Sequence, residues 1–181
     1  MDSARIKRRQ TRQIKLGCLS VGGEAPVSVQ SMTKTDTSDL KSTAAQIEEL
    51  EGAGCDIVRL AVPDAKAAEA IGELKKHTRL PLVADIHFDH RLALKALGAG
   101  ADGLRINPGN IGSRDRIEEV VRAAAGASAP IRIGVNSGSL ERDLLARHGG
   151  PTAEALVESA MRQVEILQQL DFHQIKISPK S

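Results

Sequence analysis

The sequence is almost free of aromatic residues, with no Trp, no Tyr and two Phe among its 181 residues. Since 41% of the chain is nevertheless hydrophobic, its core must be built from aliphatic side chains. The basic segment "MDSARIKRRQTRQIKLG" at residues 1–17 has no rings on which bases could stack, so a solvated tail explains it better than a nucleic-acid arm. With a net charge of only +2, we expect no nucleic-acid partner.

Long apolar runs are also missing. No stretch approaches the roughly 18 apolar residues that a membrane-spanning helix needs, and the N-terminus lacks the apolar segment of a signal peptide. We therefore expect a cytoplasmic protein with no membrane partner. The length suffices for one domain with its own core, and no linker or low-complexity segment divides the chain. Residues 1–181 are expected to form a single domain.

Cysteine is scarce, and the two residues present, Cys18 and Cys55, lie far apart and outside any C-x-x-C pair. This spacing is typical of reduced thiols and not of a disulfide framework or a zinc site. Cys55 opens an apolar segment, so we expect it to be a buried structural thiol. We expect no metal ion on this chain.

A regular alternation of strands and helices follows an expected β-hairpin at residues 11–23, where two short alternating runs flank Gly17. The alternation implies parallel strands joined by right-handed crossovers. The expected strands span 26–32, 56–62, 80–88, 102–107, 130–136 and 173–178. The expected helices span 39–54 with a cap at Ser38, then 64–77, 90–100, 114–126 and 152–170.

An open doubly wound sheet and a barrel both fit this alternation. The glycine-rich G-x-G-x-x-G fingerprint of dinucleotide-binding folds is absent, which favours the barrel. We predict an α/β fold: a TIM-type (β/α) barrel truncated to about six βα units, with the hairpin covering its N-terminal end. Because eight strands close such a barrel, the first and sixth strands should each have an unpaired edge. Unpaired edges recruit partners, so a homodimer or larger homo-oligomer is expected.

Side-chain alternation along the strands separates two sets. In the fourth strand, Leu104 and Ile106 form one set and Arg105 and Asn107 the other. The apolar set should face the helices in every strand, including Val27 and Val29 in the first and Ile175 and Ile177 in the sixth. The opposite set becomes polar toward the C-terminal ends of the strands, and it contains Arg59, Asp85, His87, Arg105, Asn107, Arg132, Asn136, Lys176 and Lys180.

The charges in this inward-facing set do not balance, since five cations face Asp85 alone. Uncompensated buried charge costs several kcal/mol, so the missing negative charge is most simply a ligand. Guanidinium forks match phosphate oxygens, and several of them suit a diphosphate. For Lys176 an alternative stays open, in which it lies lower in the barrel and pairs with Asp85 or Asp102.

Six segments closely resemble the 4-hydroxy-3-methylbut-2-enyl diphosphate synthase family of the non-mevalonate isoprenoid pathway. They are "VQSMT" (29–33), "AGCDIVRLAVP" (53–63), "LVADIHFDHRLAL" (82–94), "GLRINPGNIG" (103–112), "IRIGVNSGSLERDLL" (131–145) and "PTAEALVESA" (151–160). The resemblance runs from about residue 8 to the end of the chain.

This resemblance implies an N-terminal TIM-type barrel followed by a domain that holds a 4Fe-4S cluster on three Cys and one Glu. It implies the substrate 2-C-methyl-D-erythritol 2,4-cyclodiphosphate, electrons from flavodoxin or ferredoxin, and a homodimer. The positions that match the family's substrate-binding motifs are Arg59, His87, Arg105, Asn107, Arg132, Asn136 and Lys180. Asp85 and His87 would lie near the hydroxyl end of the substrate and are the catalytic candidates.

Compared with the family pattern, we expect this chain to be a fragment that stops in or just after the sixth strand, without the cluster domain. Cys18 and Cys55 do not match cluster positions. We therefore expect the cluster in the full-length protein only, with none bound by this chain and no activity of this chain alone. Two alternatives remain: a phosphate-binding barrel enzyme similar to dihydropteroate synthase, and a non-catalytic anion-binding fragment.

Overall fold

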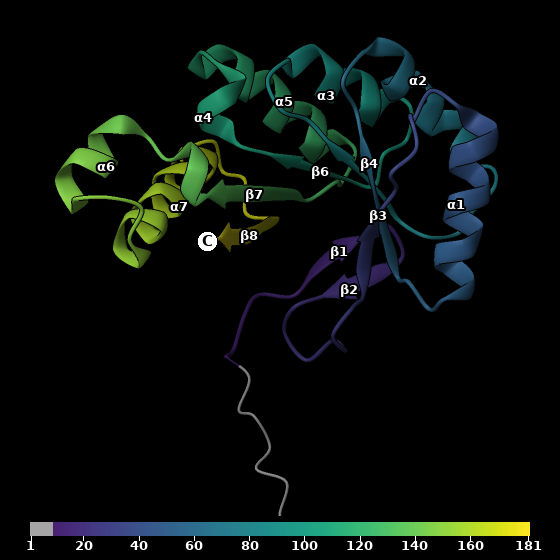
Figure 1. The fold of residues 1–181 in the computed structure, drawn as a ribbon, viewed down its shortest axis with the longest axis horizontal. Coiled ribbons are helices and arrows are strands. Elements are labelled where there is room, and N and C mark those ends of the chain that lie inside the picture. Colours follow the sequence, from purple (N-terminus) through teal and green to yellow (C-terminus); the bar gives the residue numbers. More distant parts are fainter. Residues whose placement is uncertain (1–8) are drawn as a thin grey trace, which may run out of the picture.

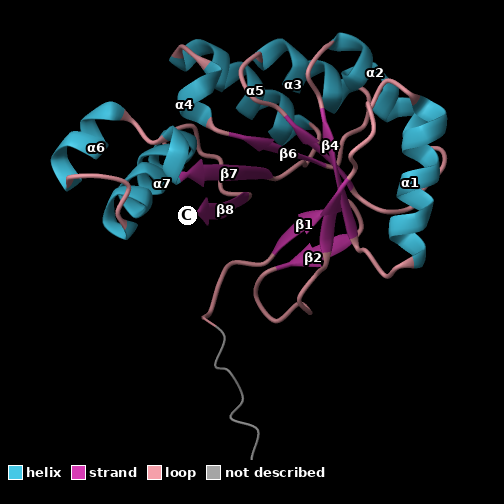
Figure 2. Ribbon diagram, viewed as in Figure 1, coloured by secondary structure: helices cyan, strands magenta, loops and turns pink. Residues whose placement is uncertain are grey.

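A computed structural model of the chain describes residues 9–181; the start of the basic segment considered above, residues 1–8, lies outside the described residues. Six parallel strands form one curled sheet in the order β3-β4-β5-β6-β7-β8. Helices cover the outer face of the curl and a two-stranded hairpin lies on its inner side (Figures 1 and 2). The predicted half-open barrel of about six βα units, with strands in chain order, is confirmed.

The elements follow the predicted alternation closely. The antiparallel hairpin pairs β1 with β2, and β3 and β8 form the two edges of the parallel sheet. The strands are β1 (Ile14–Leu16), β2 (Leu19–Val21), β3 (Gln30–Met32), β4 (Ile57–Ala61), β5 (Leu82–Asp85), β6 (Gly103–Ile106), β7 (Ile131–Asn136) and β8 (Ile175–Lys180). The helices are α1 (Leu40–Gly52), α2 (Ala65–Leu74), α3 (His90–Gly98), α4 (Pro108–Ile111), α5 (Arg114–Gly126), the 3-10 helix η1 (Ser137–Ser139), α6 (Arg142–His148) and α7 (Ala153–Gln168).

The prediction that Ser38 caps the first helix is wrong. Helix α1 begins one residue later, and the carboxylate of Asp39 accepts the backbone N–H of Ser42 at 3.1 Å. Asp64 caps α2 and Asp89 caps α3 in the same way. An aspartate satisfies the free N–H groups at a helix start as well as serine does, and its charge also favours that end of the helix dipole.

The first strand is shorter than predicted, and the placement of Val27 and Val29 against the helices is wrong. Pairing with β4 begins only at Gln30, so the two valines precede the strand and are 78% and 57% exposed. Ile177 on the opposite edge strand is also exposed, whereas Ile175 packs against the core as expected. At both edges the sheet has a neighbour on one side only, which leaves side chains uncovered.

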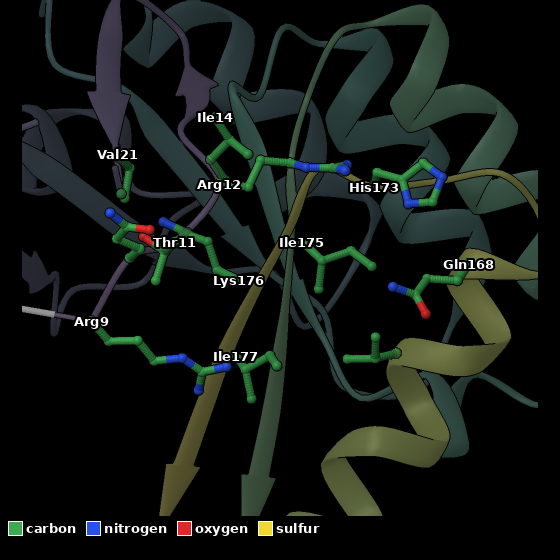
Figure 3. Close-up of a pocket in the computed structure, with 13 residues that line it drawn as sticks. Arg9, Thr11, Arg12, Ile14, Val21, Gln168, His173, Ile175, Lys176 and Ile177 are labelled. Atoms are coloured by element: carbon green, nitrogen blue, oxygen red, sulfur yellow. The ribbon is translucent and has the colours of Figure 1, made fainter. Parts of the chain in front are cut away.

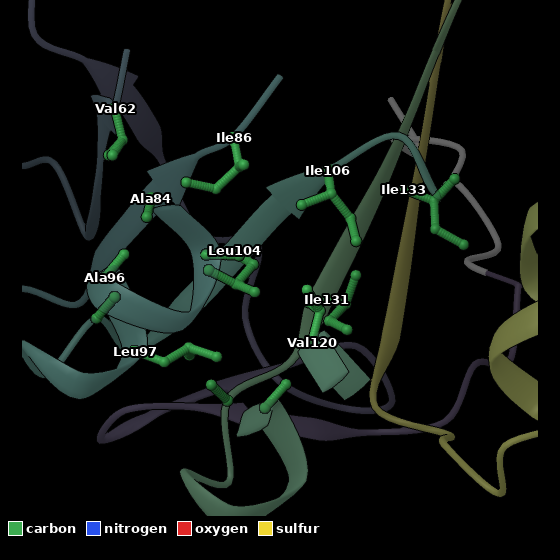
Figure 4. Packing of buried hydrophobic residues seen from close by; sticks show 14 of the residues in the cluster. Val62, Ala84, Ile86, Ala96, Leu97, Leu104, Ile106, Val120, Ile131 and Ile133 are labelled. Atoms are coloured by element: carbon green, nitrogen blue, oxygen red, sulfur yellow. The ribbon is translucent and has the colours of Figure 1, made fainter. Parts of the chain in front are cut away.

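The main core lies between the outer face of the sheet and the helices (Figure 4). Alternate strand residues such as Leu104 and Ile131 are fully buried there, opposite Val120 of α5. Among the described residues, the buried hydrophobic side chains are aliphatic apart from Phe172 and Cys55, as the composition requires. Cys55 is buried and its thiol donates to the carbonyl of Ile57 at 3.0 Å, which confirms the predicted structural thiol.

A second, smaller cluster closes the inside of the curl at the N-terminal ends of the strands. Leu16 of the hairpin packs there against Ile57 and Val83. Gly103 faces the same space, and a Cβ atom at this position would lie 2.6 Å from Cδ1 of Leu16. The missing side chain therefore makes room for the hairpin, and the prediction that the hairpin covers this end of the sheet is confirmed.

None of the helices within residues 9–181 combines the length and the apolar character that crossing a membrane requires.

Candidate functional site: a row of cations on the inner face

Charged side chains lie side by side on four neighbouring strands. Asp85 of β5 is the register partner of Arg105 in β6, Arg105 is the partner of Arg132 in β7, and Arg132 is the partner of Lys176 in β8. Register partners on parallel strands point to the same face. We call Arg105, Arg132 and Lys176 the cation row; Arg59 on β4 lies one level lower, opposite Val83.

Asp85 is the carboxylate on which the nearby cations converge. It is only 4% exposed. Its Oδ1 accepts Nη1 of Arg105 at 3.2 Å, and its Oδ2 lies 3.6 Å from Nε of Arg59. Nε2 of His87 lies at the same distance, 3.6 Å, from Oδ2. Three side chains thus share one buried negative charge, which explains how the carboxylate tolerates burial.

A glycine makes the position of Arg105 possible. Gly134 of β7 faces inward, between Arg132 and Asn136 in the alternation. A Cβ atom on Gly134 would lie 2.5 Å from both Nε and Nη2 of Arg105. The guanidinium therefore lies across the bare backbone of the next strand, where any side chain would displace it.

Arg59 has a partner that sequence reasoning missed. Its Nε and Nη2 point at the sulfur of Met32, at 3.2 and 3.0 Å. A thioether is a weak hydrogen-bond acceptor, so the fork of Arg59 keeps most of its donor capacity for a ligand. The signal was available, because Met32 shares the inward parity of Gln30 on the first strand.

The cation row carries more positive charge than its surroundings neutralise. Arg132 donates to Oγ of Ser178 at 2.6 Å, which is an uncharged partner. Burial, followed by the neighbouring charges of Arg59 and Arg105, lowers the pKa of Arg132. Burial and then Arg132 lower the pKa of Lys176 to about 8.

Within the described part of the chain, the ammonium group of Lys176 has no hydrogen-bond or ion-pair partner. The alternative in which Lys176 pairs with Asp85 or Asp102 is wrong. Asp102 instead holds Nζ of Lys75 at 2.6 Å and the backbone N–H of Leu82. Asp85 is held by the arginines described above, and no carboxylate remains for the lysine at this level of the sheet.

Above the cation row, at the C-terminal ends of the strands, four predicted site residues line one hollow of about 180 Å³. Asn107 caps α4, a short helix that was not predicted, and its Oδ1 accepts the N–H of Gly109 at 3.1 Å. β5 ends at Asp85, so His87 lies in the following loop and is largely exposed. The hollow is lined by His87, Phe88, Arg105, Asn107, Asn110, Gly134, Asn136 and Ser139.

The remaining predicted residues surround this hollow without lining it. Asp85 contacts Arg105 and His87, which line the hollow, and Arg59 contacts Asp85. Lys180 is exposed at the end of β8, where it is the register partner of Asn136. Sequence reasoning missed Phe88 and Gly134, the first because it was taken as part of a strand and the second because a glycine has no side chain to attract notice.

A larger hollow, of about 780 Å³, lies elsewhere, at the free edge of β8 (Figure 3). The hairpin residues Arg12 and Ile14 form one wall, and Ile175 and Lys176 of β8 form another. Lys176 is the one member of the cation row that lines it, and none of Arg59, Arg105 and Arg132 does. This larger hollow lies beside the unpaired edge of β8 and away from the C-terminal ends of the strands. It is therefore distinct from the 180 Å³ hollow, with which it shares no lining residue.

The cysteines of this chain do not fit an iron–sulfur cluster. Cys18 is exposed in the hairpin, whereas Cys55 is buried with its thiol directed at backbone carbonyls. Among residues 9–181, no three or more His, Cys, Asp or Glu side chains gather so that they could hold a metal ion. A cluster usually needs four ligands, mostly thiolates, so these residues do not provide its site.

Solved structures with the same architecture include dihydropteroate synthases. The enzyme from Xanthomonas albilineans superposes with a TM-score of 0.65 at 15% identity, covering 92% of this chain and 65% of that one. The Yersinia pestis enzyme has a TM-score of 0.66 at 12% identity, covering 91% of this chain and 61% of its own. At such identities the likeness shows the fold alone.

Sequence comparisons go further. This chain is 58% identical over 176 residues to 4-hydroxy-3-methylbut-2-en-1-yl diphosphate synthase (flavodoxin) of Thermodesulfovibrio yellowstonii, covering 97% of this chain and 50% of the relative. It is 59% identical to the protein of that name from Pseudomonas syringae pv. syringae, covering 48% of it. The chain thus spans about half the length of these relatives. Residues 11–181 match the GcpE TIM-barrel domain, and the chain belongs to that family.

Proposed function

We propose that this chain is the substrate-binding barrel of an enzyme that reductively opens 2-C-methyl-D-erythritol 2,4-cyclodiphosphate to 4-hydroxy-3-methylbut-2-enyl diphosphate. The observation that carries the proposal is the excess of positive charge at this site, where one carboxylate, Asp85, lies beside the cation row and the lower-lying Arg59. A diphosphate supplies the missing negative charge. The names of the relatives described above agree with this chemistry. The pterin alternative is not favoured, because its support is a likeness of fold alone.

The proposed roles follow from position. Arg59, Arg105 and Arg132 bind phosphate oxygens from below, and Lys180 with the amides Asn107 and Asn136 binds from the rim. Asp85 orients the forks of Arg59 and Arg105, since it contacts both. His87 is the exposed titratable group closest to Asp85, at 3.6 Å, and it is placed to exchange a proton with a ligand hydroxyl in the hollow.

The electrons for a reductive step would come from a 4Fe-4S cluster in the full-length enzyme, supplied by flavodoxin, which the relatives' names mention, or by ferredoxin. The cysteines of this chain do not fit that cluster. We therefore propose that the chain alone binds the substrate without turning it over. A cytoplasmic location stays a prediction.

A homodimer or larger assembly is part of the same proposal. The supporting observation is that β3 and β8 each have one free edge in the described sheet, and such edges pair with other chains. Light scattering at high protein concentration tests it. A mass equal to one chain across the whole concentration range would contradict the assembly.

Calorimetric titration with the cyclic diphosphate tests the anion site. Arg105→Ala should weaken binding by roughly tenfold to a hundredfold, because a charge-assisted contact contributes about 1.5–3 kcal/mol. Arg105→Lys should also weaken binding although it keeps the charge, since the two-pronged fork is lost. Affinity should fall as salt rises.

The matched control is Lys76→Ala. It removes an exposed cation that is paired with Glu73 and lies after helix α2, away from the cation row and the 180 Å³ hollow. It should bind as the unmodified protein does. Equal affinities for all four proteins would contradict the proposed site.

A further inference from the structure

Phe88 is an aromatic residue in an unusual place. The chain has two phenylalanines; Phe172 is buried in the core, whereas Phe88 is 70% exposed in the loop after β5. Its neighbours on both sides are held. His87 contacts Asp85, and Asp89 caps α3 while its carboxylate binds the guanidinium of Arg91 at 2.8 Å. The loop that displays the ring is therefore anchored at both ends.

The ring of Phe88 forms part of two hollows. One is the 180 Å³ hollow above the cation row, and the other has about 360 Å³ and contains Arg91 and Arg116. The rings of His87 and Phe88 meet edge to face, with centroids 6.0 Å apart at 67°. Among the described residues that line the hollow above the cation row, Phe88 is the one large apolar side chain.

Contact with such a ring does not favour the binding of a bare inorganic anion. The face of an aromatic ring carries partial negative charge and does not attract phosphate oxygens. The gain from covering the ring comes from apolar contact, which grows with the area removed from water. A ligand that satisfies the cation row and also covers Phe88 must join a phosphate group to a carbon skeleton.

We propose that Phe88 is the wall against which the carbon skeleton of the phosphorylated ligand packs, so that it selects organic phosphates over inorganic ones. This inference rests on the proposed function, which supplies the cyclic diphosphate and its methyl-bearing skeleton. The two parts of the ligand bind at different places: the cation row binds the phosphate oxygens, and Phe88 contacts the C–H groups at the rim of the same hollow.

The test compares two ligands, inorganic diphosphate and 2-C-methyl-D-erythritol 2,4-cyclodiphosphate, by calorimetric titration of the same proteins. Phe88→Ala should lose about tenfold affinity for the cyclic diphosphate and leave the affinity for inorganic diphosphate unchanged. Phe88→Leu should retain most of the affinity for the cyclic compound, because it keeps an apolar side chain. Val27→Ala, which truncates another exposed apolar residue at the opposite end of the sheet, should change neither affinity.

The outcomes separate this inference from the function on which it rests. Unchanged binding of the cyclic compound by Phe88→Ala, or an equal loss for both ligands, would overturn the role of Phe88 and leave the proposed function standing. Failure of the unmodified protein to bind either ligand would overturn the proposed function and the inference with it. Because Phe88 is largely exposed, the variants should keep the melting temperature of the parent, which is measured alongside.

Discussion

Replacing Gly134 by alanine should disturb the site through Arg105. The new Cβ atom would lie 2.5 Å from Nε and Nη2 of Arg105 and 2.8 Å from its Cζ. These distances are shorter than van der Waals contact allows, so one of the two groups must move. The obstructing group is the end of a long side chain and not backbone, so the guanidinium should move while β7 stays in place. Its displacement breaks the 3.2 Å hydrogen bond to Asp85.

The size of the effect follows from two opposing contributions. Loss of a hydrogen bond between charged groups costs about 1.5–3 kcal/mol. Alanine in a strand is favoured over glycine by about 0.5–1 kcal/mol. The free energy of unfolding should therefore fall by about 1–2 kcal/mol, which lowers the melting temperature of a chain of this length by about 2–8 °C. Affinity for the cyclic diphosphate should fall about as far as in Arg105→Ala.

A double-mutant cycle shows whether the effect passes through Arg105. In the Arg105→Ala background, Gly134→Ala should cause no further loss of diphosphate affinity. Gly138→Ala is the matched control, because a Cβ atom there meets nothing within 4 Å. If Gly134→Ala binds and melts like the parent, or if its loss of affinity adds to that of Arg105→Ala, the reasoning is refuted.

Three further perturbations have defined outcomes. Gly103→Ala places a Cβ 2.6 Å from Leu16 and should lower the free energy of unfolding by about 1–3 kcal/mol in urea titrations; an unchanged midpoint would mean that the hairpin does not depend on this space. The pKa of Lys176 lies at about 8 in the folded chain, below its ordinary 10.5. Between these pH values the unfolded chain holds a proton that the folded chain lacks, so the free energy of unfolding rises with pH. Lys176→Met should remove that rise and stabilise the protein at pH 7 by about 1 kcal/mol, a figure reduced for solvent screening; denaturant titrations that keep the same pH dependence would exclude Lys176 as its source. Anaerobic reconstitution of this chain should incorporate no stoichiometric iron and labile sulfide; iron analysis showing a full cluster would contradict the proposal that Cys18 and Cys55 do not serve as its ligands.

Much of the sheet could be predicted because strand alternation and helix periodicity are local properties. Helix α5 has the predicted bounds, Arg114–Gly126, and the inward parity of Arg105 and Arg132 follows from counting along each strand. The same counting failed at Val27, since it assumes a strand that is paired over its whole length and covered by helices. Pairing with β4 decides where an edge strand begins, and this depends on contacts distant in sequence.

The site was predictable as a set of charges and not as a geometry. Alternation assigned Asp85 and the arginines to one face, but it could not say which of them touch. The contact of Arg59 with Met32 and the passage of Arg105 over Gly134 depend on the twist and stagger of neighbouring strands. Phe88 escaped notice because an aromatic residue in an apolar run is usually a core residue, and only the end of β5 at Asp85 places it in a loop.

The two faces of the curled sheet are constrained by different demands. Its outer face carries the aliphatic cluster on which folding depends, whereas its inner face above Leu16 carries cations that repel one another. Replacing buried charges by apolar residues of similar volume often raises stability, so a variant with apolar residues at Arg132 and Lys176 should outlast the natural chain on heating while losing its affinity for anions. Changes to these cations can therefore alter the ligand while leaving the main core intact, because the residues that hold the helices are on the other side of the same strands.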